Sequence, residues 1–347
     1  MQAAVLYSAK DLRVEQRQEP SAGAKQVKVK VEWAGICGSD LHAYLHGLAL
    51  EAHPLGGQQP PFALGHEFSG TIVEVGDGVT KYAAGDRVAI EPLLYCGDCY
   101  ACSRGDYNQC MKVGFVGLHR DGGFAEYVVV DEYMLHRLPD EVSFEEGALI
   151  EPAAVSFYAV RESKLKAGDS VAIFGAGPIG LLTLLAAKAA GAMKLIVVDL
   201  SDERLQKAKE LGATAVINGN EENIAGKIIA LSNGGVNVAY ECAGAQATMT
   251  NAVASLRQGG QVMTLAVFMK PVSIDMGQIM FKAADVTATL AYRHVFPEVI
   301  GMVAAGRLDV KSVITKKIGL NQIVEEGFEQ LIQDVKQAKI LVRPSQD

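Results

Sequence analysis

Residues 170–190 read SVAIFGAGPIGLLTLLAAKAA, and this stretch decides the fold. The short apolar run at its start is typical of a buried strand, and an apolar segment of helical length follows the glycines. The glycine pattern permits a tight turn, a close backbone approach to a pyrophosphate, and close packing of helix on strand. The stretch therefore predicts a nucleotide-binding turn at the N-terminus of a helix. The residues expected at the cofactor are Gly175, Gly177, Pro178, Ile179 and Gly180.

Two charged residues downstream extend this predicted site. Asp199 closes the next apolar run, where a carboxylate would accept hydrogen bonds from the adenosine ribose and repel a 2′-phosphate. This favours NAD over NADP as the cofactor, although Asp199 could instead be a helix N-cap or a turn residue. Arg204 either stacks on the adenine or is simply solvated, and the sequence supports both interpretations equally.

Strands and helices alternate from residue 170 to about residue 291. The strands are continuous apolar runs, which predicts a parallel sheet covered by helices on both faces. The last run, Val286–Tyr292, is uncharged and is expected at the sheet edge, where it would invite pairing with a second subunit. The other expected elements are Ser170–Phe174, Ile179–Ala190, Leu195–Asp199, Glu203–Leu211, Ala215–Ile217, Ile224–Leu231, Val236–Glu241, Thr248–Leu256 and Gln261–Ala266.

The segments on either side follow another pattern. Residues 1–155 are expected to be mostly β and rich in loops. The sequence thus predicts an α/β protein in which a doubly wound Rossmann domain that binds NAD, residues 156–291, separates two parts of a catalytic domain, residues 1–155 and 292–347. Expected elements of these parts are strands Val27–Ala34, Gly70–Val75, Asp86–Ile90, Ala125–Val130, Ser312–Lys316 and Lys339–Val342, and helices Pro297–Ala305 and Ile323–Gln333.

Composition excludes several classes of protein. Of the 347 residues, 49% are hydrophobic and 21% are charged, so the chain is neither disordered nor fibrous. The net charge of −8 is dispersed without a basic cluster, which excludes nucleic acid and an anionic membrane surface as partners. The first residues lack the pattern of a signal peptide, and the most apolar stretch, Val171–Ala192, contains glycines, a proline and Lys188. We therefore expect a cytoplasmic protein that acts on a small molecule.

Four of the six cysteines crowd together: Cys96, Cys99, Cys102 and Cys110. Zinc takes four tetrahedral ligands, and a closed set of four thiolates leaves no position for a substrate. In a reducing compartment such crowding favours a metal over the two alternatives, disulfides and free buried thiols. The spacing predicts a structural zinc ion that clamps a lobe of about residues 93–113.

A second set of metal-ligating residue types is dispersed along the chain. Cys37, His66 and Glu151 offer one thiolate, one imidazole and one carboxylate, and three protein ligands leave one position open for an alcohol oxygen. Taken singly, each has an ordinary interpretation: a small core residue, a hydrogen-bonded turn histidine and a helix cap.

The pattern Gly65-His66-Glu67-x2-Gly70-x5-Gly76-x2-Val79 resembles the zinc signature of the zinc-containing medium-chain dehydrogenases, and the resemblance covers essentially the whole chain. It implies a GroES-like catalytic domain, a catalytic zinc on Cys37, His66 and Glu151, and Glu67 as a nearby carboxylate that can approach or exchange on the metal. Ser39 and His42 resemble the family's proton relay from hydroxyl through cofactor ribose to imidazole, although His42 could be an ordinary surface histidine. Such enzymes commonly form dimers or dimers of dimers.

Within that family the chain most resembles the (R,R)-2,3-butanediol dehydrogenases. The resemblance implies hydride transfer between NAD and a small secondary alcohol or vicinal diol, with 2,3-butanediol and acetoin first. A sorbitol-like polyol or polyol-phosphate dehydrogenase is the alternative, and a non-catalytic NAD-binding redox sensor is more remote. A phosphorylated substrate would need basic residues, and segment 45–62 has no Lys or Arg. The residues that carry the resemblance are 38–47, 53–55, 61–70, 147–152, 292–297 and 325–328, with the long segment between Cys37 and His66.

Overall fold

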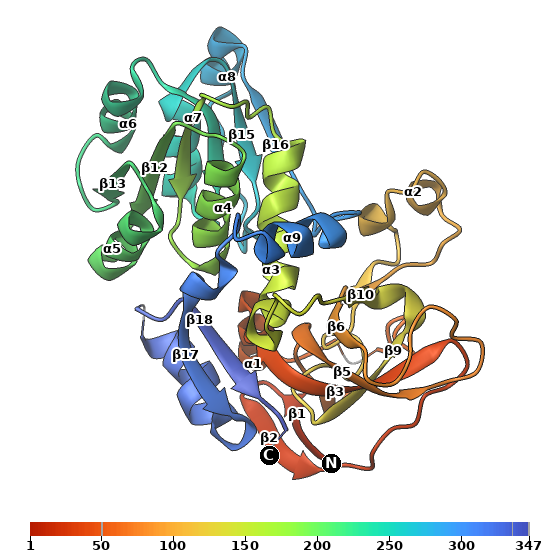
Figure 1. The fold of residues 1–347 in the computed structure, drawn as a ribbon. Helices are drawn as coiled ribbons and strands as arrows, with labels where there is room; N and C mark the ends of the chain where they lie inside the picture. Colours follow the sequence, from red (N-terminus) through yellow and green to blue (C-terminus); the bar gives the residue numbers. More distant parts are fainter. Residues whose placement is uncertain (50, 335, 346–347) are drawn as a thin grey trace. The chain divides into compact units, whose positions relative to one another are not determined.

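The computed structural model describes residues 1–49, 51–334 and 336–345, so that Leu50 of segment 45–62 lies outside the described residues. The chain forms two compact units (Figure 1). The first unit is Met1–Glu151 with Phe296–Ala305 and Ile314–Asp347, and the second unit is Pro152–Val295 with Gly306–Val313. The domain boundaries expected from the sequence stay a prediction. No helix in the described part of the chain is long and apolar enough to cross a membrane.

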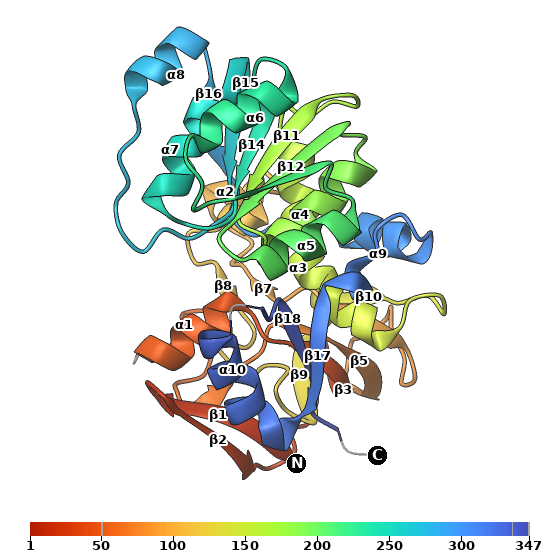
Figure 2. The same cartoon turned by 90° about the vertical axis from the view of Figure 1, so that its left-hand side faces the viewer.

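The second unit is built on a six-stranded parallel sheet in the order β13-β12-β11-β14-β15-β16. Helices lie on both faces of this sheet (Figure 2). All five residues of β11, Ser170–Phe174, are buried, which is why this strand is a continuous apolar run. The predicted doubly wound parallel sheet is therefore confirmed. The other strands are β12 (Lys194–Asp199), β13 (Ala215–Asn218), β14 (Val236–Glu241), β15 (Leu256–Thr264) and β16 (Asp285–Ala288), and the helices are α4 (Pro178–Ala189), α5 (Asp202–Leu211), α6 (Ile224–Ser232), α7 (Gln246–Ser255) and α8 (Met276–Lys282).

Three elements differ from the sequence-based expectation. The edge strand β16 ends at Ala288 rather than at Tyr292, because Ala291 has a left-handed backbone (φ 46°) that a strand cannot continue through. Helix α8 was not expected, because its seven residues make fewer than two turns, too few to show a helical period in the sequence. Helix α3 (Phe144–Glu162) was not expected either, because Pro152 lies inside it and its middle is buried on all sides, which removes the helical period.

The first unit is mostly β. Its largest sheet runs in the order β10-β6-β5-β3-β18-β17, with β9 also paired to β3, and smaller sheets are β2-β1-β4 and β7-β8. In β3 (Gln26–Gly35) Val27, Val29 and Val31 are fully buried, so the predicted alternation is confirmed. The remaining strands are β1 (Gln2–Ser8), β2 (Asp11–Gln16), β4 (Phe62–Ala63), β5 (Glu67–Val75), β6 (Arg87–Ile90), β7 (Leu93–Leu94), β8 (Gly114–Phe115), β9 (Tyr127–Asp131), β10 (Leu135–Arg137), β17 (Ile314–Gly319) and β18 (Lys339–Arg343).

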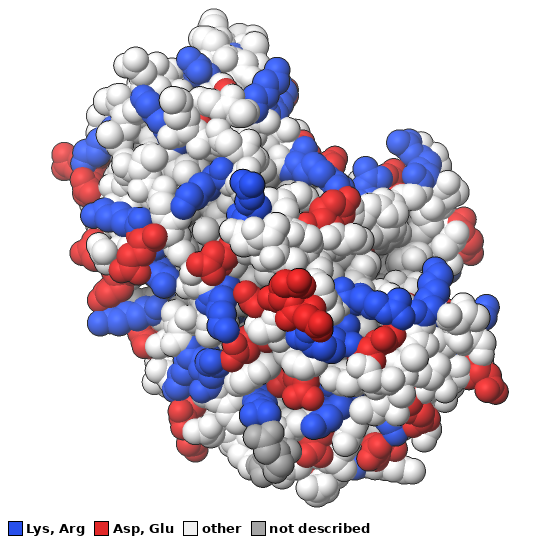
Figure 3. Space-filling view, in the orientation of Figure 1, with Lys and Arg blue, Asp and Glu red and all other residues white. Residues whose placement is uncertain are grey.

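The helices of the first unit are short and lie at the ends of its strands. The helix expected at Ile323–Gln333 is a π-helical segment, Ile323–Glu329, followed by a short α-helix. The strand expected at Ser312–Lys316 begins only at Ile314, after a 3-10 turn. The α-helices are α1 (Gly38–His46), α2 (Tyr100–Ser103), α9 (Phe296–Ala304) and α10 (Gln330–Gln333). On the face drawn in Figure 3, basic and acidic side chains are interspersed.

Candidate functional site

Cys37 lies in the turn between β3 and α1. It is the N-cap residue of α1, with an extended backbone (φ −103°, ψ 160°). Its N–H donates to the carboxylate of Asp40 at 2.9 Å, and Asp40 is fully buried. Because this bond fixes the first turn of α1, the thiol of Cys37 has a set position at the end of β3.

Two polar groups approach the ring of His66, which immediately precedes β5. Asp40 Oδ1 lies 3.4 Å from Nδ1 of His66, and the Ser39 hydroxyl lies 3.3 Å from Nε2. Burial lowers the pKa of His66, but the charges of Asp40 and Cys37 outweigh burial, and the pKa is raised well above its ordinary value. A carboxylate facing Nδ1 is the arrangement that orients a histidine for metal binding through Nε2. The anionic surroundings therefore suit a cation at this ring.

Glu67 and Lys339 form a buried ion pair beside these residues. Nζ of Lys339 donates to Oε1 and Oε2 of Glu67, at 2.8 and 2.6 Å, and to the carbonyl of Ile36 at 2.9 Å. Burial lowers the pKa of Lys339, but Glu67 and Cys37 more than offset burial and raise the pKa. Lys339 begins β18, which pairs with β3, so the sheet brings this ammonium close behind Cys37.

The donor atoms of Cys37, His66 and Glu67 lie within 4.8 Å of one another. Thiolate, imidazole and carboxylate are the ligand types that zinc takes, so this donor set fits the metal. Glu151, the carboxylate expected as third ligand, is not part of this group of three. It lies in α3, is 5% exposed, and contributes to the raised pKa of Lys339. The structure thus brings Glu67, rather than Glu151, to Cys37 and His66.

A cavity of about 230 Å³ lies in the first unit next to this group, and Ser39 and His42 both line it. His42 is exposed on α1, and its ring centroid lies 4.6 Å from that of His46. Residues three and four apart share one face of a helix, so Ser39 and His42 point to the same side of α1.

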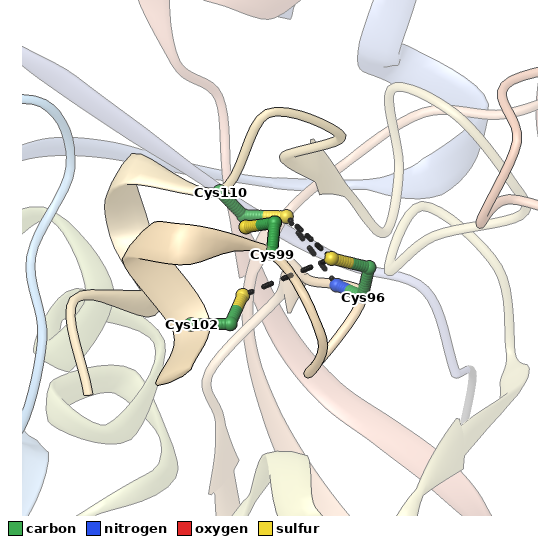
Figure 4. A group of neighbouring side chains, drawn as sticks. All are labelled: Cys96, Cys99, Cys102 and Cys110. Carbon is green, nitrogen blue, oxygen red and sulfur yellow. Dashed lines mark hydrogen bonds between the residues drawn. The ribbon is translucent and has the colours of Figure 1, made fainter. Parts of the chain in front are cut away.

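The four cysteines of the lobe point toward one another from a loop and two short helical segments (Figure 4). Sγ of Cys96 lies 3.5 Å from Sγ of Cys110 and 3.9 Å from Sγ of Cys102. Sulfur atoms on a tetrahedral zinc, at a Zn–S distance of about 2.3 Å, lie about 3.8 Å apart, whereas a disulfide bond measures about 2.05 Å. The arrangement fits a closed zinc site, and all six cysteines are free.

The ionisation of these thiols also indicates a cation. Backbone N–H groups of Cys102 and Met111 lower the pKa of Cys99 to about 6. Burial, together with the neighbouring thiols, raises the pKa of Cys102 to about 12. Cys99 therefore ionises near neutral pH, whereas Cys102 would need a nearby cation to ionise with it.

The glycine turn of the second unit has the geometry expected for a pyrophosphate. Gly175 has φ +101°, a conformation that favours glycine. A side chain at Gly180 would overlap the carbonyl of Gly175, whereas a Cβ at Gly177, the N-cap of α4, would meet no atom within 4 Å. Close packing at Gly180 and open space at Gly177 are what a bound dinucleotide requires. Pro178 and Ile179 form the first turn of α4 behind this space.

Asp199 is linked to this turn. It ends β12, and its carboxylate accepts from the N–H groups of Ala176, at 2.6 Å, and Ser201, at 2.9 Å. Ser201, not Asp199, is the N-cap of α5, so Asp199 does not cap this helix, whereas its bond from the N–H of Ser201 agrees with the other alternative, a turn residue. Arg204 lies half-buried in the first turn of α5.

Two residues beside Cys37, His66 and Glu67 have little or no signal in the sequence. Lys339 has no spacing signal that ties it to Glu67, because the two are joined only through the pairing of strands across β3. Asp40 carries a usable signal, since it stands three residues after Cys37, at the capping-box position of a helix.

Comparison with known proteins gives matches over the whole chain. Family profiles match at residues 23–140, for the alcohol dehydrogenase GroES-like domain, and at residues 178–305, for zinc-binding dehydrogenase. The (R,R)-butanediol dehydrogenase of Bacillus subtilis (strain 168) is 45% identical over 350 residues, which cover 99% of this chain and 100% of that protein. The sorbitol dehydrogenase of the same organism is 36% identical over 351 residues, which cover 99% and 98%.

Solved structures agree with these matches. The 2R,3R-butanediol dehydrogenase from Bacillus subtilis has a TM-score of 0.94 and 44% identity, and the match covers 99% of both chains. A zinc-binding dehydrogenase from Sinorhizobium meliloti 1021, bound to NADP, has a TM-score of 0.90 and 33% identity, with 99% of both chains covered. A short chain alcohol dehydrogenase from Escherichia coli CFT073, complexed with NADH, has a TM-score of 0.90 and 31% identity, with the same coverage. The family resemblance is confirmed, and the chain belongs to the zinc-binding alcohol dehydrogenases.

Proposed function

We propose that this protein transfers hydride between NAD and a small secondary alcohol or vicinal diol, with 2,3-butanediol and acetoin as the first pair. The observation that carries the proposal is the group Cys37, His66 and Glu67, which lies beside a cavity that Ser39 also lines. The similarity to a butanediol dehydrogenase over the full chain supports the choice of substrate.

The proposal includes two zinc ions per chain. The four cysteines of the lobe would hold the structural one. Cys37, His66 and a carboxylate would hold the catalytic one, with Glu151 as the expected third ligand and Glu67 kept close by Lys339. When bound, zinc supplies a Lewis acid that lowers the pKa of an alcohol hydroxyl, and NAD supplies the hydride acceptor.

Residues beside Cys37, His66 and Glu67 are placed to carry the proton of the alcohol to solvent. The Ser39 hydroxyl, 3.3 Å from Nε2 of His66, is placed to accept the proton of the alcohol at Oγ. The imidazole of His42, one turn further along α1 and exposed, is placed to pass a proton to solvent. Buried Asp40 holds the turn that carries both residues through its bond to the N–H of Cys37.

We propose NAD rather than NADP as the cofactor. Family membership alone does not choose between them, because one related structure holds NADH and another holds NADP. Asp199 favours NAD, because its carboxylate lies at the glycine turn and would repel a 2′-phosphate. Gly175, Gly177, Pro178, Ile179 and Gly180 would face the pyrophosphate, and Arg204 would lie against the adenine or in solvent.

The alternative substrates are a polyol and a polyol phosphate. The described residues that line the cavity include Glu51 and no Lys or Arg. A phosphate group would meet this negative charge with no lysine or arginine in the described lining to bind it, so a neutral alcohol is favoured. A sorbitol-like polyol stays the alternative. A redox sensor would need neither Ser39 and His42 nor a metal group next to a cavity.

A substrate panel followed at the NADH absorbance band tests the function. We expect 2,3-butanediol to have the highest kcat/KM, at least about tenfold above sorbitol and a polyol phosphate, because one misplaced polar group in a small pocket costs that much. If sorbitol were the best substrate, the polyol alternative would replace the proposal. If no alcohol yielded NADH, the enzyme function would be rejected.

We also propose that the chain forms a homodimer or a dimer of dimers through β16. This strand is the edge of the parallel sheet, and apolar side chains near it are exposed. Unpaired edge strands and contiguous apolar surface both favour association. The exposed side chains are Val267, Met269, Met276, Met280, Phe281, Val286 and Leu290. The free cysteines fit a reducing compartment, so we propose the cytoplasm as the location.

A further inference from the structure

The cavity beside Ser39 has a second polar wall that the mechanism above does not use. It is formed by two imidazole rings, His53 and His119, whose centroids lie 4.4 Å apart. The two rings come from segments far apart in the sequence, one before β4 and one after β8. Their meeting is therefore a product of the tertiary fold and not of local sequence.

Backbone N–H groups determine which nitrogen of each ring is an acceptor. The N–H of Leu55 donates to Nδ1 of His53 at 3.2 Å, and the N–H of Phe115 donates to Nδ1 of His119 at 3.0 Å. A nitrogen that accepts a hydrogen bond carries no proton, so the proton of each neutral ring is on Nε2. Burial and the neighbouring His53 lower the pKa of His119, which keeps this ring neutral. Each ring thus offers one N–H donor through Nε2.

The packing around the rings of His53 and His119 depends on two glycines. A Cβ at Gly114 would lie 2.6 Å from Cε1 of His53, so only glycine lets this ring lie where it does. A Cβ at Gly56 would overlap the carbonyl oxygen of His119. Two glycines therefore permit the close approach of the two segments that carry the rings.

His119 is also tied to the metal group through a single residue. Its Nδ1 accepts from Phe115, and the ring of Phe115 lies 6.2 Å, centroid to centroid, from the ring of His66. Ser39 lines the same cavity, and its hydroxyl is 3.3 Å from Nε2 of His66. Ser39 and both histidines therefore face one cavity, which a single small molecule can occupy.

We propose that Nε2–H of His119 donates a hydrogen bond to the second oxygen of the substrate, the hydroxyl or carbonyl oxygen on the carbon next to the one that is oxidised. His53 is a positioning residue that holds the ring of His119. The apolar side chains Phe62 and Leu118, in the same lining, suit the hydrocarbon part of the substrate. The inference rests on the proposed function and explains how the site would prefer a vicinal diol or hydroxyketone over a simple alcohol.

Two substitutions of His119 distinguish its two roles, as a donor to the cavity through Nε2–H and as an acceptor of the Phe115 N–H through Nδ1. In His119→Asn the amide oxygen replaces Nδ1, so the bond from Phe115 is kept and the Nε2–H donor is lost. In His119→Gln the amide N–H₂ reaches the place of Nε2, so the donor is kept and the loop bond is lost. The measurement is kcat/KM for 2,3-butanediol and for 2-butanol, which has the same carbon chain and lacks the second oxygen.

We expect His119→Asn to lower kcat/KM for 2,3-butanediol about tenfold, the value of one hydrogen bond, and to leave that for 2-butanol within about twofold. His119→Gln should retain most of the preference for the diol. His53→Asn, the matched change in the partner ring, should weaken the preference less than His119→Asn does.

An equal loss on both substrates in His119→Asn would overturn the inference, because the residue would then have only a structural role. So would an unchanged preference, or a loss confined to His119→Gln. Each of these outcomes leaves a wild-type enzyme that is active on alcohols, so the proposed function would stand. If the wild type oxidised neither substrate, the proposed function would fail and this inference with it.

Discussion

Lys339 donates through Nζ to both carboxylate oxygens of Glu67, at 2.8 and 2.6 Å, where neither side chain is more than 2% exposed. Glu67 belongs to β5 and Lys339 to β18, and β3, which delivers Cys37, runs between these strands. The pair therefore spans the strand that ends at the metal group. Its carboxylate is held within 4.8 Å of the donor atoms of Cys37 and His66, and its ammonium is stabilised chiefly by Glu67.

Breaking this ion pair should destabilise the first unit. Lys339→Met leaves the carboxylate of Glu67 buried without its partner, and we expect the free energy of unfolding to fall by about 3–5 kcal/mol, measured in urea. The double variant Lys339→Met with Glu67→Gln should recover part of this loss. Lys317→Met removes an exposed lysine paired with Glu145 and should cost less than about 1 kcal/mol. If Lys339→Met lowered the free energy of unfolding by as little as Lys317→Met does, the pair Glu67–Lys339 would have no structural role.

The pH dependence of this contribution follows from the raised pKa of Lys339. A basic group whose pKa is higher in the folded than in the unfolded state stabilises the fold fully below its unfolded pKa, about 10.4 for lysine. The contribution is lost only as pH rises through the higher folded pKa. The stability difference between wild type and Lys339→Met should therefore stay constant up to about pH 10 and shrink above it.

Asp199 should determine the choice between NAD and NADP. Asp199→Ser removes the carboxylate that would bind the ribose and repel a 2′-phosphate, and we expect the ratio of kcat/KM for NAD over NADP to fall about tenfold or more. Asp202→Ser, in the first turn of α5, removes an exposed carboxylate bound to Asn218 and should leave the ratio unchanged. A wild-type protein that used both cofactors equally would show that Asp199 is not the ribose ligand.

The edge strand β16 should carry the subunit interface. Val286 is 38% exposed at this edge, and Val286→Lys adds a charge of the kind that edge strands use to prevent pairing. Light scattering at working concentration should show a dimer or tetramer for wild type and a shift toward monomer for Val286→Lys. Met193→Lys makes an equally drastic change at an exposed residue before β12 and should leave the oligomer intact. A monomeric wild type would rule the interface out.

The proton relay predicts a pH-dependent defect. His42→Gln should slow alcohol oxidation mainly at neutral pH and below, and the rate should partly recover at high pH, where hydroxide takes the proton directly. Ser39→Ala should cost more, because it removes the first acceptor. His46→Gln, on the same helix and 4.6 Å away, is the matched control and should retain the wild-type profile. Wild-type rates for His42→Gln at every pH would make His42 an ordinary surface histidine.

The second unit could be predicted almost completely from the sequence, because its signals are local. Buried parallel strands such as β11 are continuous apolar runs, and the glycine turn lies between such a strand and its helix. The four cysteines are predictable for the same reason, since their spacing alone brings the four sulfur atoms together.

The metal group of the first unit was predicted less completely, because its geometry depends on strand pairing. Cys37, His66 and the nearby carboxylate of Glu67 were all identified, but the sequence does not show that Glu67 rather than Glu151 groups with the first two, because Lys339 from the far end of the chain holds Glu67 in place. Glu151 is buried because the middle of α3 is covered on nearly all sides. A helix covered in this way shows no alternation of apolar and polar residues at the helical period, so the sequence does not reveal it. The pairing of His53 with His119 depends on two glycines and cannot be inferred from either segment alone.

Zinc content measured together with NADH formation tests the central claim most directly. Wild-type protein should contain about two zinc ions per chain, and Cys37→Ala should contain about one and lose activity toward 2,3-butanediol. Cys242→Ala changes a thiol outside both metal groups and should retain both ions and the activity. A metal-free preparation that oxidised the alcohol at the full rate would contradict the account.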